Sequence, residues 1–125
     1  EVQLIIQNMS FKASLGQVDY HSKELEIVQD ADRLDAIGAI GIARAFNYGG
    51  FKNREIYNPE VPVVENMNKD SYKNSTAPTI NHFYEKLFKL TDMMNTDTAK
   101  QIAKERDEYM KAFIAEFLDE WEGKR

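Results

Sequence analysis

The sequence has 125 residues, of which 42% are hydrophobic and 30% are charged, and its formal net charge is −5 at pH 7. These values predict one globular domain and exclude a uniformly basic surface, so we expect no nucleic-acid polymer as a partner. The lack of cysteine excludes disulfides and thiolate chemistry, and the lack of a membrane-length apolar run or signal-peptide pattern predicts a cytoplasmic protein with no membrane partner.

The first half of the chain shows two apolar patterns with helical spacing. The first predicts a short helix over residues 2–10, followed by a loop that contains Gly16. The second predicts a helix from about Lys23 to about Asn47, with Ser22 as its N-cap. Gly49 and Gly50 follow this pattern and are expected to end the helix.

Residues 49–78 are predicted to form a long irregular loop. This segment is rich in Asn, Lys and Ser, contains prolines, and shows no convincing alternation of apolar and polar residues. A loop of this length inside a compact domain is usually functional or mobile. We therefore expect it to contribute to whatever site the protein carries.

Two further helices are predicted after the loop. Pro78 suits the start of a helix over about 79–94, and residues 95–97 suit a turn and cap before a last helix over about 98–121. Apolar residues recur at intervals of three and four in both segments. The sequence therefore predicts a single all-α domain over 1–125, with about four helices and the irregular loop at 49–78.

The stretch "VQDADRLDAIGAIGIARAF" places three aspartates before an apolar run. On one unbroken helix over 23–47, Asp32 falls inside the apolar stripe, Asp35 borders the stripe and Asp30 lies opposite. We therefore expect a buried Asp32 and a solvated Asp30. A buried carboxylate must be paired, protonated or bound to a metal. A structural salt bridge or helix cap is the simplest interpretation, and a ligand or catalytic role is the alternative.

This stretch resembles the last metal-ligand segment of the HD-domain phosphohydrolases. That superfamily binds a divalent metal through a histidine, a His-Asp doublet and a later aspartate in an Ala-Asp-Arg/Lys-Leu context, and residues 31–34 here read Ala-Asp-Arg-Leu. The resemblance continues through "YGGFKNREIYNP" and "NHFYEKLFKL" to the last helix. It points to the small bacterial HD proteins that are similar to nucleotide pyrophosphohydrolases.

The resemblance implies a helical HD-domain-like bundle and a metal-dependent hydrolase acting on a nucleotide-like phosphate ester or anhydride. Asp32 would be a ligand of the metal, expected to be manganese or a similar divalent ion. Asp35 would be a catalytic residue that orients the metal-bound water or a neighbouring group. It could equally pair with Arg33 or Arg44.

The sequence departs from the family pattern in one respect, because it contains no His-Asp doublet. His21 precedes Ser22, and His82 precedes Phe83. We therefore expect the chain to correspond to the C-terminal portion of an HD-type domain, to retain metal poorly and to be inactive alone. The alternative is a non-catalytic helical fragment or interaction module that self-associates as a homo-oligomer.

Four residues are candidates for binding a nucleotide or another phosphorylated small molecule. His82 and Lys86 lie four residues apart, with Lys89 three residues later, so they share one face of the third helix. Lys52 and Arg54 fall in the long loop, where they suit polyphosphate recognition. A solvated helix face and an ordinary charged loop are the simpler interpretations.

Overall fold

The computed structural model describes residues 22–64 and 76–125, and all regular structure within these residues is helical. The all-α prediction is confirmed, whereas the helix predicted over residues 2–10 lies outside the described residues. The elements are α3 (Lys23–Leu34), α4 (Gly38–Phe51), α6 (Thr79–His82), the π-helix η1 (Phe83–Leu87), α7 (Phe88–Leu90), the 3-10 helix η2 (Thr91–Met93) and α8 (Asp97–Trp121).

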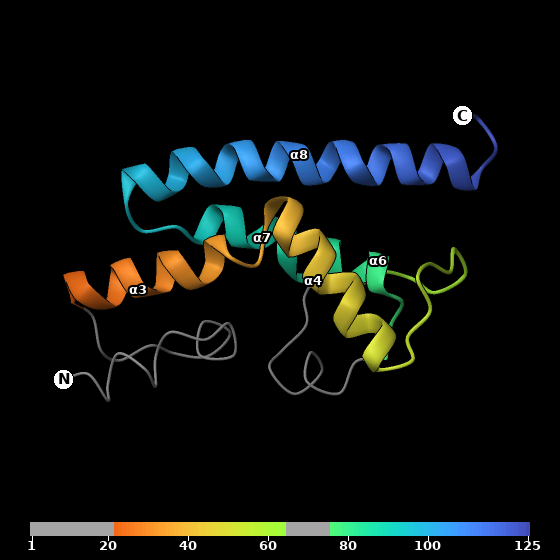
Figure 1. Cartoon of the computed structure of the whole chain (residues 1–125), viewed down its shortest axis with the longest axis horizontal. Helices are drawn as coiled ribbons and strands as arrows, with labels where there is room; N and C mark the ends of the chain where they lie inside the picture. Colours follow the sequence, from red (N-terminus) through yellow and green to blue (C-terminus); the bar gives the residue numbers. More distant parts are fainter. Residues whose placement is uncertain (1–21, 65–75) are drawn as a thin grey trace.

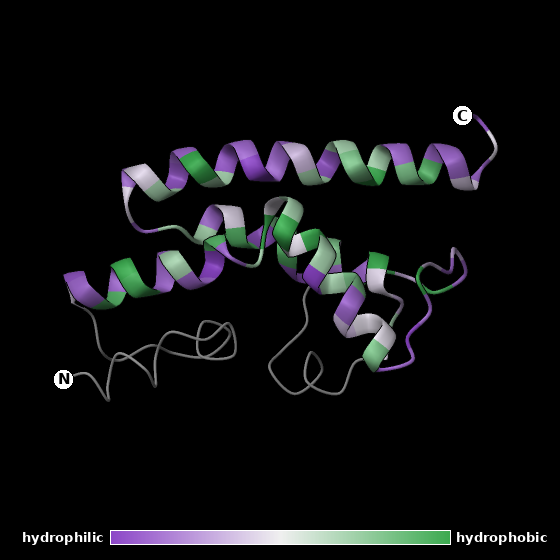
Figure 2. Ribbon diagram, viewed as in Figure 1, coloured by the Kyte–Doolittle hydropathy of each residue, from purple (hydrophilic) through white to green (hydrophobic). Residues whose placement is uncertain are grey.

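The long helix α8 lies along one side of the molecule (Figure 1), and α3, α4 and η2 pack against it. Apolar residues are interspersed with polar residues along α8, as expected for a helix with one buried face (Figure 2). The buried core joins this face to α4 and to the segment from α6 to η2. Its fully buried large members include Ile37, Ile80, Phe83, Leu90 and Met110.

The single helix predicted over 23–47 is wrong, because the chain breaks between α3 and α4. Gly38, the first residue of α4, has a φ of +74°, a left-handed value that does not occur in the interior of an α-helix and that favours glycine. Gly41 packs so closely on the turn that a Cβ at this position would overlap the carbonyl group of Ala36. The two glycines therefore make the break possible, and α4 takes its own direction.

The predicted stop at Gly49 and Gly50 is also wrong, because α4 continues to Phe51. The helix ends in a Schellman motif, in which the N–H of Arg54 donates to the carbonyl of Gly49 at 2.9 Å and the N–H of Asn53 donates to that of Gly50 at 3.1 Å. Asn53 takes the left-handed conformation, with a φ of 57°. The irregular segment therefore begins at residue 52.

The cap predicted at Ser22 is confirmed, and the cap predicted within residues 95–97 is formed by Thr96. The side chain of Ser22 accepts the N–H of Leu25 at 3.0 Å, and Thr96 accepts the N–H of Ala99 at 3.2 Å. The helix predicted over 79–94 is observed as a continuous rod from α6 to η2, but the sequence did not predict the π-helix in its middle. None of the described helices is long and apolar enough to cross a membrane.

Candidate functional site

The two aspartates Asp30 and Asp32 occupy environments opposite to those predicted. Asp30 is only 4% exposed, and its carboxylate accepts the N–H groups of Asn95 at 2.7 Å and of Thr96 at 2.9 Å. Asp32 is exposed and lines a cleft. The prediction failed because it extended the helical wheel past Leu34, where the helix ends.

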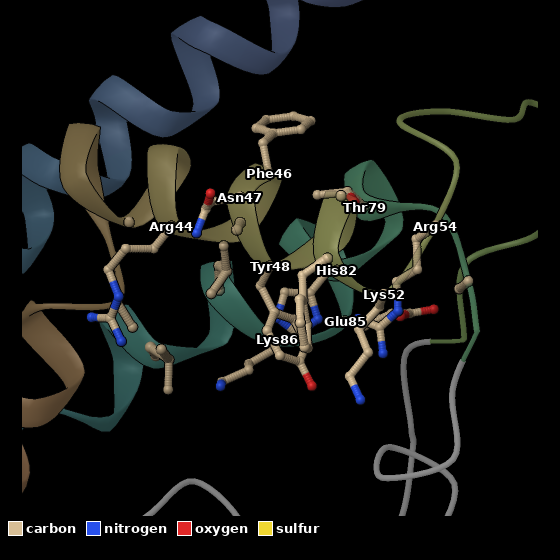
Figure 3. A pocket seen from close by; sticks show the side chains of 18 of the residues that line it. Arg44, Phe46, Asn47, Tyr48, Lys52, Arg54, Thr79, His82, Glu85 and Lys86 are labelled. Carbon is tan, nitrogen blue, oxygen red and sulfur yellow. The ribbon is translucent and has the colours of Figure 1, made fainter.

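The cleft lies between the end of α3, the length of α4 and the rod that contains α6 and η1. Its volume is about 1440 Å³, more than the roughly 300–1,000 Å³ of an ordinary small-molecule pocket, as suits an open groove. In Figure 3, Arg44 lies at one end, Lys52 and Arg54 lie at the other, and Lys86 lies between them. The cleft could therefore accept an elongated ligand.

Positive side chains predominate in the cleft. Five Lys and Arg residues line it, against two Asp and Glu residues, although the whole chain carries a net charge of −5. One of the five is committed to the fold: Arg33 is 6% exposed, and its Nη1 donates to the carbonyl of Met93. Burial lowers the pKa of Arg33, while Asp30 and Asp32 oppose this shift. The other four positive residues are Arg44, Lys52, Arg54 and Lys86.

The rod contributes His82, Glu85 and Lys86 to the cleft from adjacent turns. The π-helix adds a residue to the turn and so shifts the faces that follow it, which is a common feature of functional sites. All four of the predicted substrate-binding residues, Lys52, Arg54, His82 and Lys86, line the cleft. Lys89 does not line it, so the predicted stripe is only partly retained.

Burial is the largest cause of the pKa shifts of His82 and Glu85. Burial, together with the positive charges of Lys86 and Arg54, lowers the pKa of His82 to about 4. His82 is therefore neutral at pH 7, with one ring nitrogen able to donate and the other able to accept. Burial also raises the pKa of Glu85, against the opposing effects of the Val64 N–H, Lys89 and Arg54.

Glu85 and Asn81 hold the irregular segment against the rod. A carboxylate oxygen of Glu85 accepts the N–H of Val64 at 3.1 Å, and the amide of Asn81 donates to the carbonyls of Val61 at 3.1 Å and Pro62 at 3.4 Å. Both residues are buried, at 4% and 2% exposure. Glu85 therefore forms part of the wall of the cleft and anchors a neighbouring segment.

Aromatic and positive side chains meet at the C-terminal end of α4. The guanidinium of Arg54 lies 5.3 Å from the centre of the Tyr48 ring, and the ammonium of Lys52 lies 5.8 Å from the centres of both the Tyr48 and Phe51 rings. The Schellman turn reverses the chain and returns Arg54 to this end of the helix. Sequence reasoning missed both rings because it placed the helix end before Phe51.

Asp35 is the C-cap of α3, three residues after Asp32, and it is not among the residues that line the cleft. Its side chain is exposed, and its backbone carbonyl accepts Nη1 of Arg44 at 2.8 Å. Arg44, which was considered only as a partner for Asp35, instead lines the cleft. The catalytic role of Asp35 stays a prediction.

A metal centre is not complete within the part of the chain that the structure describes. No three His, Asp or Glu side chains come together there as ligands. Asp32 offers one exposed carboxylate to the cleft, and a hard divalent cation needs several oxygen or nitrogen donors. The described residues therefore do not fit a metal by themselves.

Comparison with known proteins points to relatives that are longer than this chain. No family model matches the sequence. The protein YpgQ of Bacillus subtilis is 43% identical over 112 residues, which are 88% of this chain and 46% of YpgQ. The chain spans about half the length of the relatives that it matches, so it can be compared with that half only.

Solved structures show the same fold. A protein of Lactobacillus plantarum has 48% identity and a TM-score of 0.91, covering 98% of this chain and 57% of its own. An HD-superfamily hydrolase of Bacillus thuringiensis has 52% identity and a TM-score of 0.67 over 81% of this chain and 47% of its own. YpgQ in complex with ADP has 44% identity and a TM-score of 0.62, over 79% and 44%. The chain is thus similar to an HD-superfamily hydrolase in sequence and fold.

Proposed function

We propose that the cleft binds the phosphate groups of a nucleotide and that the chain forms this part of an HD-type phosphohydrolase. The observation that carries the proposal is the predominance of Lys and Arg along one cleft of an acidic chain. The likeness to an HD-superfamily hydrolase supports the reaction class, and the ADP complex of YpgQ supports the ligand class.

The positive side chains would act by neutralising phosphate charge. Lys86 is the central one of the four, between Arg44 at one end and the pair Lys52 and Arg54 at the other (Figure 3). A guanidinium can bind two phosphate oxygens at once, whereas an ammonium acts as a compact charge. Neutral His82 would add a hydrogen bond to a phosphate oxygen without a full charge of its own.

Asp32 is proposed as one ligand of a divalent metal, with the remaining ligands coming from outside the described residues. Its exposed carboxylate lines the cleft, at the end where α3 stops and α4 begins. When bound, such a metal would supply Lewis-acid chemistry at a phosphate. The identity of the metal and the inactivity of this chain alone remain predictions.

Calorimetry with ADP and with inorganic pyrophosphate tests the phosphate-binding role. We expect Lys86→Gln to weaken the binding of both ligands by about 10-fold, the cost of one charge-assisted hydrogen bond. Lys100→Gln is the matched control, because Lys100 is exposed on α8 and does not line the cleft. Equal affinities for the wild type and Lys86→Gln would refute the proposal.

Self-association is a second candidate, and exposed apolar side chains favour it. Ile27 on α3 is 52% exposed and Ile40 on α4 is 69% exposed, and neither lines the cleft. A homo-oligomer could bury both. Size-exclusion chromatography with light scattering distinguishes a monomer from a homo-oligomer. A monomer at high protein concentration would argue against self-association.

A further inference from the structure

The proposed phosphate site leaves one part of the cleft unexplained, namely the aromatic end of α4. Nine large hydrophobic side chains are exposed among the described residues, and only Tyr48 and Phe51 of these line the cleft. Tyr48 is 51% exposed and Phe51 is 77% exposed. An exposed phenylalanine beside a charged groove contributes little to folding, which suggests a role in binding.

The two ends of α4 differ in chemistry. Asp32, Ala36 and Gly41 line the cleft where α4 begins, and Phe51 lines it where α4 ends. A helix of 14 residues separates these ends by about 20 Å. The cleft therefore has a carboxylate at one end, positive charges along its length and aromatic rings at the other end.

We propose that Phe51 and Tyr48 form a stacking platform for the base of the bound nucleotide, so that its phosphates point along α4 toward Lys86 and Asp32. This inference rests on the proposed function and deepens it by orienting the ligand. An aromatic ring at the end of a positively charged groove matches a molecule that is anionic at one end and flat at the other. Phe51 offers the more exposed ring, because the guanidinium of Arg54 lies over Tyr48.

Lys52 lies over the same rings but does not prevent stacking. Its ammonium is 5.8 Å from both ring centres, and the residue is exposed. An exposed cation–π contact is weaker than stacking of a base on an aromatic ring. A base can therefore displace the flexible side chain of Lys52, which keeps its charge close to the ligand.

Two ligands separate base binding from phosphate binding. We expect Phe51→Ala to weaken the binding of ADP by about 10-fold and to leave the affinity for inorganic pyrophosphate within about 2-fold. Phe51→Trp, which keeps a stacking ring, should restore ADP binding, and Phe51→Leu should not. Tyr109→Ala is the matched control, because Tyr109 is 57% exposed on α8 and does not line the cleft.

The outcomes separate the two proposals. If Lys86→Gln weakens both ligands while Phe51→Ala changes neither or both equally, the phosphate site stands and the stacking platform is refuted. If the wild-type chain binds neither ligand, or Lys86→Gln has no effect, the proposed function fails and the platform fails with it. Saturation-transfer NMR adds an independent measure, since the adenine protons of ADP should receive less saturation in Phe51→Ala than in the wild type.

Discussion

The carboxylate of Asp30 accepts the backbone N–H of Asn95 at 2.7 Å, although 65 residues separate them in the sequence. The same carboxylate accepts the N–H of Thr96 at 2.9 Å and the side-chain amide of Asn95 at 3.1 Å. It thereby fastens α3 to the turn that begins α8. These bonds explain why a carboxylate can be buried here without a metal.

Replacement of this residue should destabilise the fold. Asp30→Ala leaves two backbone N–H groups without their acceptor, so we expect the free energy of unfolding to fall by about 2–3 kcal/mol. Urea denaturation measures the change. Asp32→Ala, on the exposed side of the same helix, is the control and should change stability by less than about 0.5 kcal/mol. Equal losses in the two variants would contradict the assignment.

The break between α3 and α4 should depend on Gly41. A Cβ at this position would overlap the backbone carbonyl of Ala36, so we expect Gly41→Ala to lower the free energy of unfolding by about 1–3 kcal/mol. Gly50 lies on the same helix with no atom within 4 Å of a Cβ, so Gly50→Ala should be neutral or stabilise by up to about 1 kcal/mol. Thermal unfolding of the two variants compares these effects, and similar shifts would exclude the steric explanation.

Local signals in the sequence were enough to locate the ends of the helices that carry side-chain caps. Ser22 caps its helix as predicted, and Thr96 supplies the cap that was predicted within residues 95–97. The break at residues 35–37 could not be predicted in this way, because it depends on the left-handed φ of Gly38 and on a close backbone contact of Gly41. The spacing of apolar residues gives no sign that the helix stops before these glycines. The helical wheel was therefore extended past Leu34, and Asp30 and Asp32 were assigned to the wrong environments.

The candidate site was predictable only in part, for a related reason. Lys52, Arg54, His82 and Lys86 were selected by charge and by resemblance, and the fold does bring them into one cleft. The aromatic rings were not selected, since periodicity alone cannot show that α4 extends past two glycines. The roles of all these residues stay predictions until binding is measured.

The C-terminal end of α4 offers a test of its Schellman motif. Asn53 has a φ of 57°, a conformation that costs roughly 1–2 kcal/mol for a residue with an ordinary side chain and almost nothing for glycine. We therefore expect Asn53→Ala to destabilise the protein by about 1 kcal/mol and Asn53→Gly to be neutral or stabilising. Urea denaturation gives both values, and a loss in Asn53→Gly larger than in Asn53→Ala would rule out this account.

The free energy of unfolding should decrease as the pH is lowered, because His82 has a lowered pKa in the folded state. Its pKa in the folded state is about 4, below the ordinary value of 6.5 that holds in the unfolded chain. Between these two values the unfolded state binds more protons, so the stability from this group is complete above about pH 7 and is lost as the pH falls toward 4. The loss amounts to at most about 3 kcal/mol. Urea denaturation at pH 7.5 and pH 4.5 should therefore show a smaller difference for His82→Gln than for the wild type.

A bound anion should reverse part of the shift in His82. Lys86 and Arg54 contribute to the lowered pKa through their positive charges, and pyrophosphate bound between them would neutralise that contribution while leaving the burial unchanged. We therefore expect the pKa of His82 to rise toward its ordinary value when pyrophosphate binds. The imidazole resonance of His82 is identified by its disappearance in His82→Gln. Its NMR titration gives the pKa of His82 with and without pyrophosphate. A pKa that does not move, at saturating pyrophosphate, would mean that the anion binds away from His82 and that the phosphate site lies elsewhere on the chain.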